Sequence, residues 1–154
     1  MELIAFSEND YLSLYAFMRP IWLDTYGGFL PEEQVLFLLD KYFAPHNLTK
    51  FRQKGYQYFK IDDVGVLVFV EREQDVYLDK LYLLPSARGK GYASFAFEQL
   101  LKLKKDIVLN VNQNNERAVA CYQKHGFCID EIIDIPLGNG MINQDYVMRK
   151  KYQP

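Results

Sequence analysis

The chain has 154 residues, of which 49% are hydrophobic and 25% are charged, proportions typical of one folded domain and not of a disordered chain. Its net charge of −2 argues against a non-specific nucleic-acid binder, because such proteins normally carry a basic excess. No apolar run approaches the roughly 18 residues of a membrane span, and no secretory leader is recognisable. We therefore expect a cytoplasmic protein with one domain over residues 1–154 and neither a nucleic-acid nor a membrane partner.

The thiol and imidazole content limits the chemistry further. Cys121 and Cys128 are the only cysteines, and the chain has two histidines. Two thiols make no disulfide framework, and these residues provide no pattern of metal ligands. We expect both cysteines to be buried and reduced, and we expect no metal.

The first third of the chain combines one strand with helices. Residues 3–6 form a short apolar run that predicts a strand. Ser7 is placed to cap a helix, with Asp10 three residues later in place of the usual Glu of a capping box. Pro20 is expected to interrupt this helix before it resumes and ends at Gly27.

The hydrophobic period changes from helical to alternating near the middle of the chain. Helices are expected from Leu30 to Pro45 and over residues 47–54. Strands are expected over residues 56–61, 65–71 and 76–84, with polar turns between them. The middle of the chain is therefore predicted to be an antiparallel meander, and its second strand reads as buried on both faces.

The last third returns to alternating elements. We expect a helix after Pro85, a strand over residues 107–111, a helix that ends at Gly126, and two final strands over residues 127–135 and 142–149. This order predicts a mixed α/β domain.

The first candidate site is the segment from Arg88 to Ala93. Gly89 and Gly91 let the backbone approach a ligand closely, and the N–H groups at the start of the next helix favour an anion. Arg88 and Lys90 add positive charge. Ser94 stands where a dinucleotide fingerprint requires a third glycine, and no Walker lysine motif closes the loop. A phosphate cradle is one reading, and a structural turn with two glycines is the other.

The second candidate lies in the helix before Gly126. Asn115, Ala118 and Tyr122 share one face of this helix, and Gly126 is expected to end it in a left-handed conformation. Asn114 and Asn115 can both cap the helix. By itself, the segment also fits an ordinary amphipathic helix with a glycine stop.

Together the two segments carry a family resemblance. Three features together resemble the GNAT superfamily of acyl-CoA N-acyltransferases: the strand that ends in Leu81-Tyr82-Leu83-Leu84-Pro85, then Arg-x-x-Gly-x-Ala from Arg88, then Asn-x-x-Ala-x-x-x-Tyr-x-x-x-Gly-Phe from Asn115. The element order agrees over the whole chain, and the motifs are sharpest over residues 78–127. The resemblance implies a mixed, mostly antiparallel sheet that splays into a V between two central parallel strands, with helices on both faces.

The resemblance also implies a role for individual residues. The backbone of the strand would pair with the pantetheine arm of acetyl-CoA, and the glycine loop would hold its pyrophosphate. Asn115 would contact the pantetheine arm, and the Tyr122 hydroxyl would lie near the thioester sulfur as the catalytic acid. The residues implied for the strand and the loop are Leu81, Tyr82, Leu83, Arg88, Gly89, Lys90, Gly91, Tyr92 and Ala93.

The implied reaction is acetyl transfer from acetyl-CoA to a primary amine by direct attack, without an acyl-enzyme. Trp22 and Tyr26 belong to a stretch similar to one in polyamine-acetyltransferase-like members, so they are candidate acceptor-binding residues, although simple core packing also explains their spacing. Asp79, Glu71 and His46 are all conceivable bases, and the sequence does not choose among them.

Several alternatives remain open at this point. The high aromatic content favours a small-molecule amine, with a polyamine as one candidate, over a protein N-terminus or lysine. A non-catalytic acyl-CoA-binding regulatory module is the rival from another class, and the presence of Tyr122 argues against it. Relatives often dimerise, so the resemblance favours a homodimer.

Overall fold

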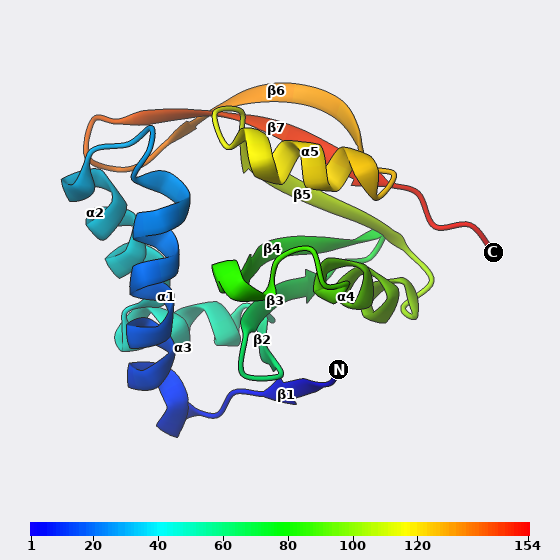
Figure 1. Ribbon diagram of the computed structural model, residues 1–154, viewed down its shortest axis with the longest axis horizontal. Helices are drawn as coiled ribbons and strands as arrows, with labels where there is room; N and C mark the ends of the chain where they lie inside the picture. The colour runs from blue at the N-terminus through cyan, green and yellow to red at the C-terminus, as the bar shows by residue number, and fades with distance from the viewer. The chain divides into compact units, whose positions relative to one another are not determined.

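The computed structural model describes residues 1–154 as a mixed α/β fold whose sheet has the strand order β1-β2-β3-β4-β5-β7-β6 (Figure 1). The seven strands are β1 (Leu3–Ala5), β2 (Gln57–Ile61), β3 (Gly65–Glu71), β4 (Asp75–Leu83), β5 (Asp106–Asn112), β6 (Cys128–Pro136) and β7 (Ile142–Lys150). The helices are α1 (Tyr11–Tyr26), α2 (Glu32–Phe43), α3 (Pro45–Gln53), α4 (Tyr92–Leu101) and α5 (Glu116–Lys124), with 3-10 turns η1 (Glu8–Asp10) and η2 (Pro85–Ala87). The predicted fold class is confirmed, including the parallel pairing of β4 with β5 in a mostly antiparallel sheet.

The chain divides into two compact units. Unit 1 comprises Met1–Phe69 and Lys80–Tyr92, and unit 2 comprises Val70–Asp79 and Ala93–Pro154. Strand β4 contributes its first half to unit 2 and its second half to unit 1. The expectation of one domain over residues 1–154 stays a prediction.

Unit 1 is built from the first three strands and the first three helices. Strand β2 pairs antiparallel with β1 and with β3, and Ile61 faces Leu3 on one side and Gly65 on the other. Residues 65–69 of β3 are all buried, as expected for a strand covered on both faces. Helices α1, α2 and α3 gather in one group beside these strands (Figure 1). Their fully buried side chains include Leu14, Met18, Ile21, Leu39, Phe43 and Leu48.

The capping box predicted at Ser7 is present, but it begins the 3-10 turn η1, and α1 follows from Tyr11. The Asp10 carboxylate accepts hydrogen bonds from the Ser7 N–H at 2.8 Å and from its hydroxyl at 3.0 Å, which lower the pKa of Asp10. The predicted interruption at Pro20 is wrong, because α1 continues through it to Tyr26. Proline removes one backbone donor, and the neighbouring Ile21 and Trp22 are buried, so packing holds the helix through this point.

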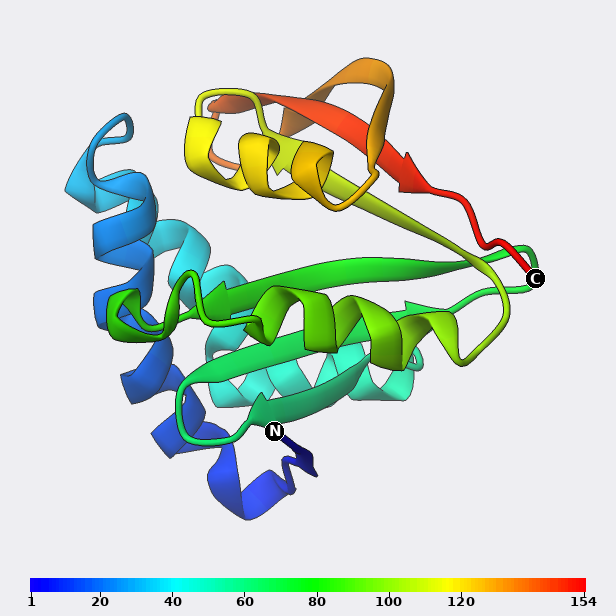
Figure 2. The same cartoon turned by 45° about the vertical axis from the view of Figure 1, so that its right-hand side comes forward.

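Unit 2 centres on the other four strands. The parallel register runs from Asp75 opposite Asp106 to Leu78 opposite Leu109, and β7 pairs antiparallel with β5 and β6. Helix α5 lies along the layer formed by β5 and β7 (Figure 2).

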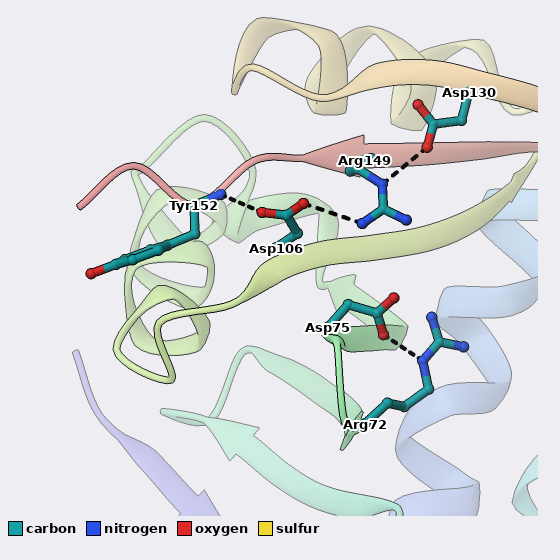
Figure 3. Close-up of polar contacts among 6 residues, drawn as sticks. All are labelled: Arg72, Asp75, Asp106, Asp130, Arg149 and Tyr152. Atoms are coloured by element: carbon teal, nitrogen blue, oxygen red, sulfur yellow. Dashed lines mark hydrogen bonds and ion pairs between the residues drawn. The ribbon is translucent and has the colours of Figure 1, made fainter.

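Arg149 on β7 links the strands of this unit through two carboxylates (Figure 3). Its Nε lies 3.1 Å from Asp130 Oδ2 on β6, and its Nη1 lies 3.2 Å from Asp106 Oδ2 on β5. The hydrogen bond with Asp130 makes the largest contribution to raising the pKa of Arg149, and the hydrogen bond with Asp106 raises it further. The Tyr152 N–H also donates to Asp106 Oδ1 at 2.8 Å, which ties the segment after β7 to the same strand.

The cysteines differ in their surroundings. Cys121 on α5 is half-buried, and burial raises the pKa of its thiol. Cys128 is exposed, so the expectation that both cysteines are buried is wrong. The reason is that Cys128 begins the edge strand β6, whose first five residues are all exposed.

No helix is both long enough and apolar enough to cross a membrane, and no three His, Cys, Asp or Glu side chains gather where they could hold a metal ion.

Candidate active site

The glycine loop between η2 and α4 has the backbone geometry of an anion cradle. Gly89 has φ of +73° and Gly91 has φ of +89°, both in the left-handed region that glycine favours. The N–H groups of Gly89, Lys90 and Gly91 donate to no backbone carbonyl. Helix α4 begins directly after the loop at Tyr92, so its positive end lies beside these donors. Unpaired N–H groups beside a helix N-terminus are the donors that an anion such as a phosphate group requires.

The glycine loop is anchored at both of its ends within unit 1. Arg88 Nη2 lies 3.1 Å from Asp24 Oδ2 on α1, and both side chains are partly exposed. At the other end, desolvation and a hydrogen bond to the Asp62 carboxylate raise the pKa of the Tyr92 phenol. Asp62 itself accepts the Glu2 N–H at 2.9 Å. The loop is thus held by α1 and by the turn between β2 and β3.

The second half of β4 leads into the loop and is packed closely against the start of β3. A Cβ atom added at Gly65 would lie 2.8 Å from the Tyr82 carbonyl oxygen and 2.7 Å from the Leu83 side chain. The Leu84 N–H donates to the Val64 carbonyl at 2.8 Å. Sequence reasoning missed Gly65, although a glycine at the start of an otherwise bulky apolar strand signals a close backbone approach.

Trp22 and Tyr26 of α1, the candidate residues for binding the acceptor, lie against Tyr82 in the second half of β4. The Trp22 ring centroid lies 5.2 Å from that of Tyr26 and 5.7 Å from that of Tyr82, and the hydroxyls of Tyr26 and Tyr82 are hydrogen-bonded to each other. Trp22 is only 3% exposed, which agrees with the interpretation of this residue as part of the core. The structure therefore brings Trp22, Tyr26 and Tyr82 together, within unit 1.

Helix α5 holds the other two predicted residues. Asn115 is 6% exposed, and its Oδ1 accepts the Ala118 N–H at 3.3 Å, so Asn115 rather than Asn114 caps the helix. The half-buried Tyr122 ring packs against Phe97 at 6.1 Å and Phe127 at 5.5 Å. Contacts with two aromatic rings restrict the rotation of the Tyr122 side chain.

The candidate residues are divided between the units. Unit 2 contains Ala93, Asn115 and Tyr122, and unit 1 contains the rest. Among the possible bases, Glu71 forms an ion pair with Lys105 at 3.1 Å.

The chain belongs to the acetyltransferase (GNAT) family, whose model matches residues 16–127. The predicted family is therefore confirmed. An uncharacterised N-acetyltransferase of Mycobacterium bovis is 41% identical to this chain over 81 residues, which cover 49% of this chain and 51% of that protein. The peptidyl-lysine N-acetyltransferase YjaB of Escherichia coli is 32% identical over 88 residues, which cover 50% of this chain and 60% of YjaB.

The fold is also similar to that of a solved structure over almost its whole length. The crystal structure of the PaiA N-acetyltransferase of Thermoplasma acidophilum in complex with coenzyme A matches with a TM-score of 0.73 and 22% identity, covering 98% of each chain. The chain spans only about half the length of the curated relatives it matches in sequence.

Proposed function

We propose that this protein is an N-acetyltransferase that transfers the acetyl group of acetyl-CoA to a primary amine of a small molecule. The observation that carries the proposal is the glycine loop, with its two left-handed glycines and N–H groups that donate to no backbone carbonyl. Family membership supports the same cosubstrate.

Both units contain residues with a proposed role in cosubstrate binding. In unit 1, the pyrophosphate would take hydrogen bonds from the loop, with Arg88 and Lys90 as counter-charges, and the pantetheine arm would pair with the backbone of residues 81–83. In unit 2, the side-chain amide of Asn115 would contact the pantetheine arm. The cap that Asn115 makes through its oxygen leaves its amide hydrogens as donors.

The proposed reaction forms the amide C–N bond and breaks the thioester C–S bond. The amine must first lose a proton, which for an alkylamine with a pKa of about 10.4 costs about 4.6 kcal/mol at pH 7. A backbone N–H of residues 81–83 would stabilise the oxyanion, and the Tyr122 hydroxyl would protonate the departing thiolate. The packing of Tyr122 against Phe97 and Phe127 supports a fixed position for this acid.

The acceptor is a small primary amine in this proposal, and the sequence around Trp22 and Tyr26, taken alone, favours a polyamine within that class. YjaB is a peptidyl-lysine N-acetyltransferase, so a peptide lysine is the second candidate acceptor. The aromatic cluster of α1 favours a small molecule, because ring walls suit a compact ligand better than an extended peptide backbone. The homodimer stays a prediction.

The test is thiol release from acetyl-CoA with a panel of polyamines, alkylamines, amino acids and lysine peptides. We expect Tyr122→Phe to lower kcat by about 10²-fold or more while the dissociation constant of coenzyme A is unchanged. Tyr152→Phe, which removes a hydroxyl from the segment after β7, serves as the matched control. An unchanged rate in Tyr122→Phe would show that Tyr122 is not the acid. Acetyl-CoA should also raise the melting temperature, and no rise at saturation would overturn the proposal.

A further inference from the structure

One buried donor in unit 1 has no partner. The Nε1–H of Trp22 is buried and makes no hydrogen bond, although the great majority of buried polar atoms in proteins are paired. Four aromatic rings, those of Tyr26, Tyr42, Phe43 and Tyr82, have centroids within 5.2–6.2 Å of the indole. An unpaired donor in such a cluster points to a ligand group that the free protein lacks.

Polar side chains that can donate a hydrogen bond lie at this cluster. The hydroxyls of Tyr26 and Tyr82 contact each other at its edge. The Lys80 ammonium lies 4.4 Å from the centroid of the Tyr42 ring, which brings a positive charge to the cluster. Each of these side chains can donate a hydrogen bond to an oxygen atom.

The acidic side chains of α1 and α2 are committed elsewhere or exposed. Asp24, two residues after Trp22, forms the ion pair with Arg88. Asp40 accepts the Tyr15 hydroxyl at 2.8 Å. Glu32 and Glu33 are exposed in the first turn of α2. A bare polyamine requires several carboxylates, because its ammonium groups are donors only and cannot accept a hydrogen bond from an indole N–H.

We propose that the Trp22 Nε1–H binds a carboxylate of the acceptor, so that the acceptor is an amino-acid-type compound with a free primary amine and not a bare polyamine. This inference rests on the proposed acetyl transfer and names the acceptor class. Tyr26 and Tyr82 are both half-buried, and side-chain rotation would exchange their mutual hydroxyl contact for the ligand.

Binding can be tested without relying on activity, because the chain has a single tryptophan and hence a single indole N–H resonance. The protein, saturated with coenzyme A, is titrated with L-lysine and separately with 1,5-diaminopentane, which differ only in the carboxylate. L-ornithine and 1,4-diaminobutane form a second matched pair. We expect the amino acids to shift the indole resonance and the diamines to leave it in place. An unmoved resonance, or an equal shift with the diamines, overturns the inference.

Activity provides the second measurement. We expect kcat/KM for L-lysine to exceed that for 1,5-diaminopentane, and Trp22→Phe to reduce this preference by about 10-fold or more. Tyr15→Phe, on the same helix, should retain the preference, and an unchanged dissociation constant for coenzyme A shows that the Trp22 variant is folded. A preference for the diamine, or a preference that survives Trp22→Phe, overturns the inference and leaves the acetyltransferase proposal intact. If no amine of the full panel is acetylated, the proposed function itself fails.

Discussion

Ser94 and His125 join the first turn of α4 to the end of α5 through a contact of 3.0 Å between Ser94 Oγ and His125 Nε2. The other ring nitrogen, Nδ1, lies 2.8 Å from the carbonyl oxygen of Cys121. A carbonyl oxygen only accepts hydrogen bonds, so Nδ1 must carry the proton, and the Nε2 lone pair accepts the Ser94 hydroxyl. The Phe97 ring packs edge-on against the imidazole at 5.1 Å, which holds it in this orientation. Sequence reasoning did not find this contact.

We therefore predict that neutral His125 is the Nδ1–H tautomer, which nitrogen chemical shifts will show. The chain has only two histidines, so the assignment is simple. Ser94→Ala removes the donor to Nε2 and should lower the free energy of unfolding by about 0.5–1.5 kcal/mol, measured by urea denaturation. Ser86→Ala, at an exposed position of η2, should have little effect. Finding the Nε2–H tautomer would contradict the assignment.

Gly65 is expected to tolerate no side chain. Because its added Cβ would lie only 2.8 Å from the Tyr82 carbonyl oxygen, Gly65→Ala must push β3 away from β4. We expect a loss of about 1–3 kcal/mol in the free energy of unfolding, together with weaker binding of coenzyme A. Gly28→Ala is the matched control, since nothing lies within 4 Å of its added Cβ. Equal stability of the two variants would show that the close approach is absent.

The two adjacent asparagines before α5 should differ in their contribution to stability. Asn115→Ala removes the side-chain oxygen that accepts the Ala118 N–H, and we expect it to cost about 0.5–2 kcal/mol. Asn114→Ala changes an exposed side chain and should be nearly neutral. Thermal unfolding of both variants checks this prediction. If Asn114→Ala were the more harmful change, the cap would be misassigned.

The two thiols should react at different rates. Burial raises the pKa of Cys121, so less of it is thiolate at a given pH, and its half-buried sulfur is harder to reach. Cys128 is exposed and should be modified first by iodoacetamide at neutral pH, as peptide mass spectrometry will show. In denaturant the difference should disappear. Faster modification of Cys121 in the folded protein would show that its thiol is not the more buried of the two.

Local chemistry made much of the fold and site predictable. Turn residues and hydrophobic period predicted the order of elements, and the structure confirms that order. The left-handed conformation expected at Gly126 is present, with φ of +90°, because a residue past a helix end needs only its own backbone freedom. Gly89 and Gly91 in the loop after η2 are also left-handed, and this conformation likewise depends only on the backbone freedom of each glycine. Each of these features depends on residues within one turn of the chain.

Two sequence-based expectations failed where packing between distant segments outweighs local preference. Pro20 disfavours a helix locally, but buried neighbours in unit 1 support α1 across it. Cys128 is an apolar residue that prefers burial, but its strand lies at the edge of the sheet, where its side chain is exposed. Pro45 ends the expected second helix and also opens α3, since its missing N–H is not needed in a first turn.

The sequence by itself determined the family, the loop that suits a phosphate group and the identity of the candidate acid Tyr122, because short motifs encode these features. Only the tertiary structure showed that Tyr82, 56 residues beyond Tyr26, shares a hydrogen bond with it. It also showed that the Trp22 N–H lies among rings from other elements without a partner. The physical reason is that a side chain's partners depend on the path of the whole chain, which brings together groups that no local spacing relates.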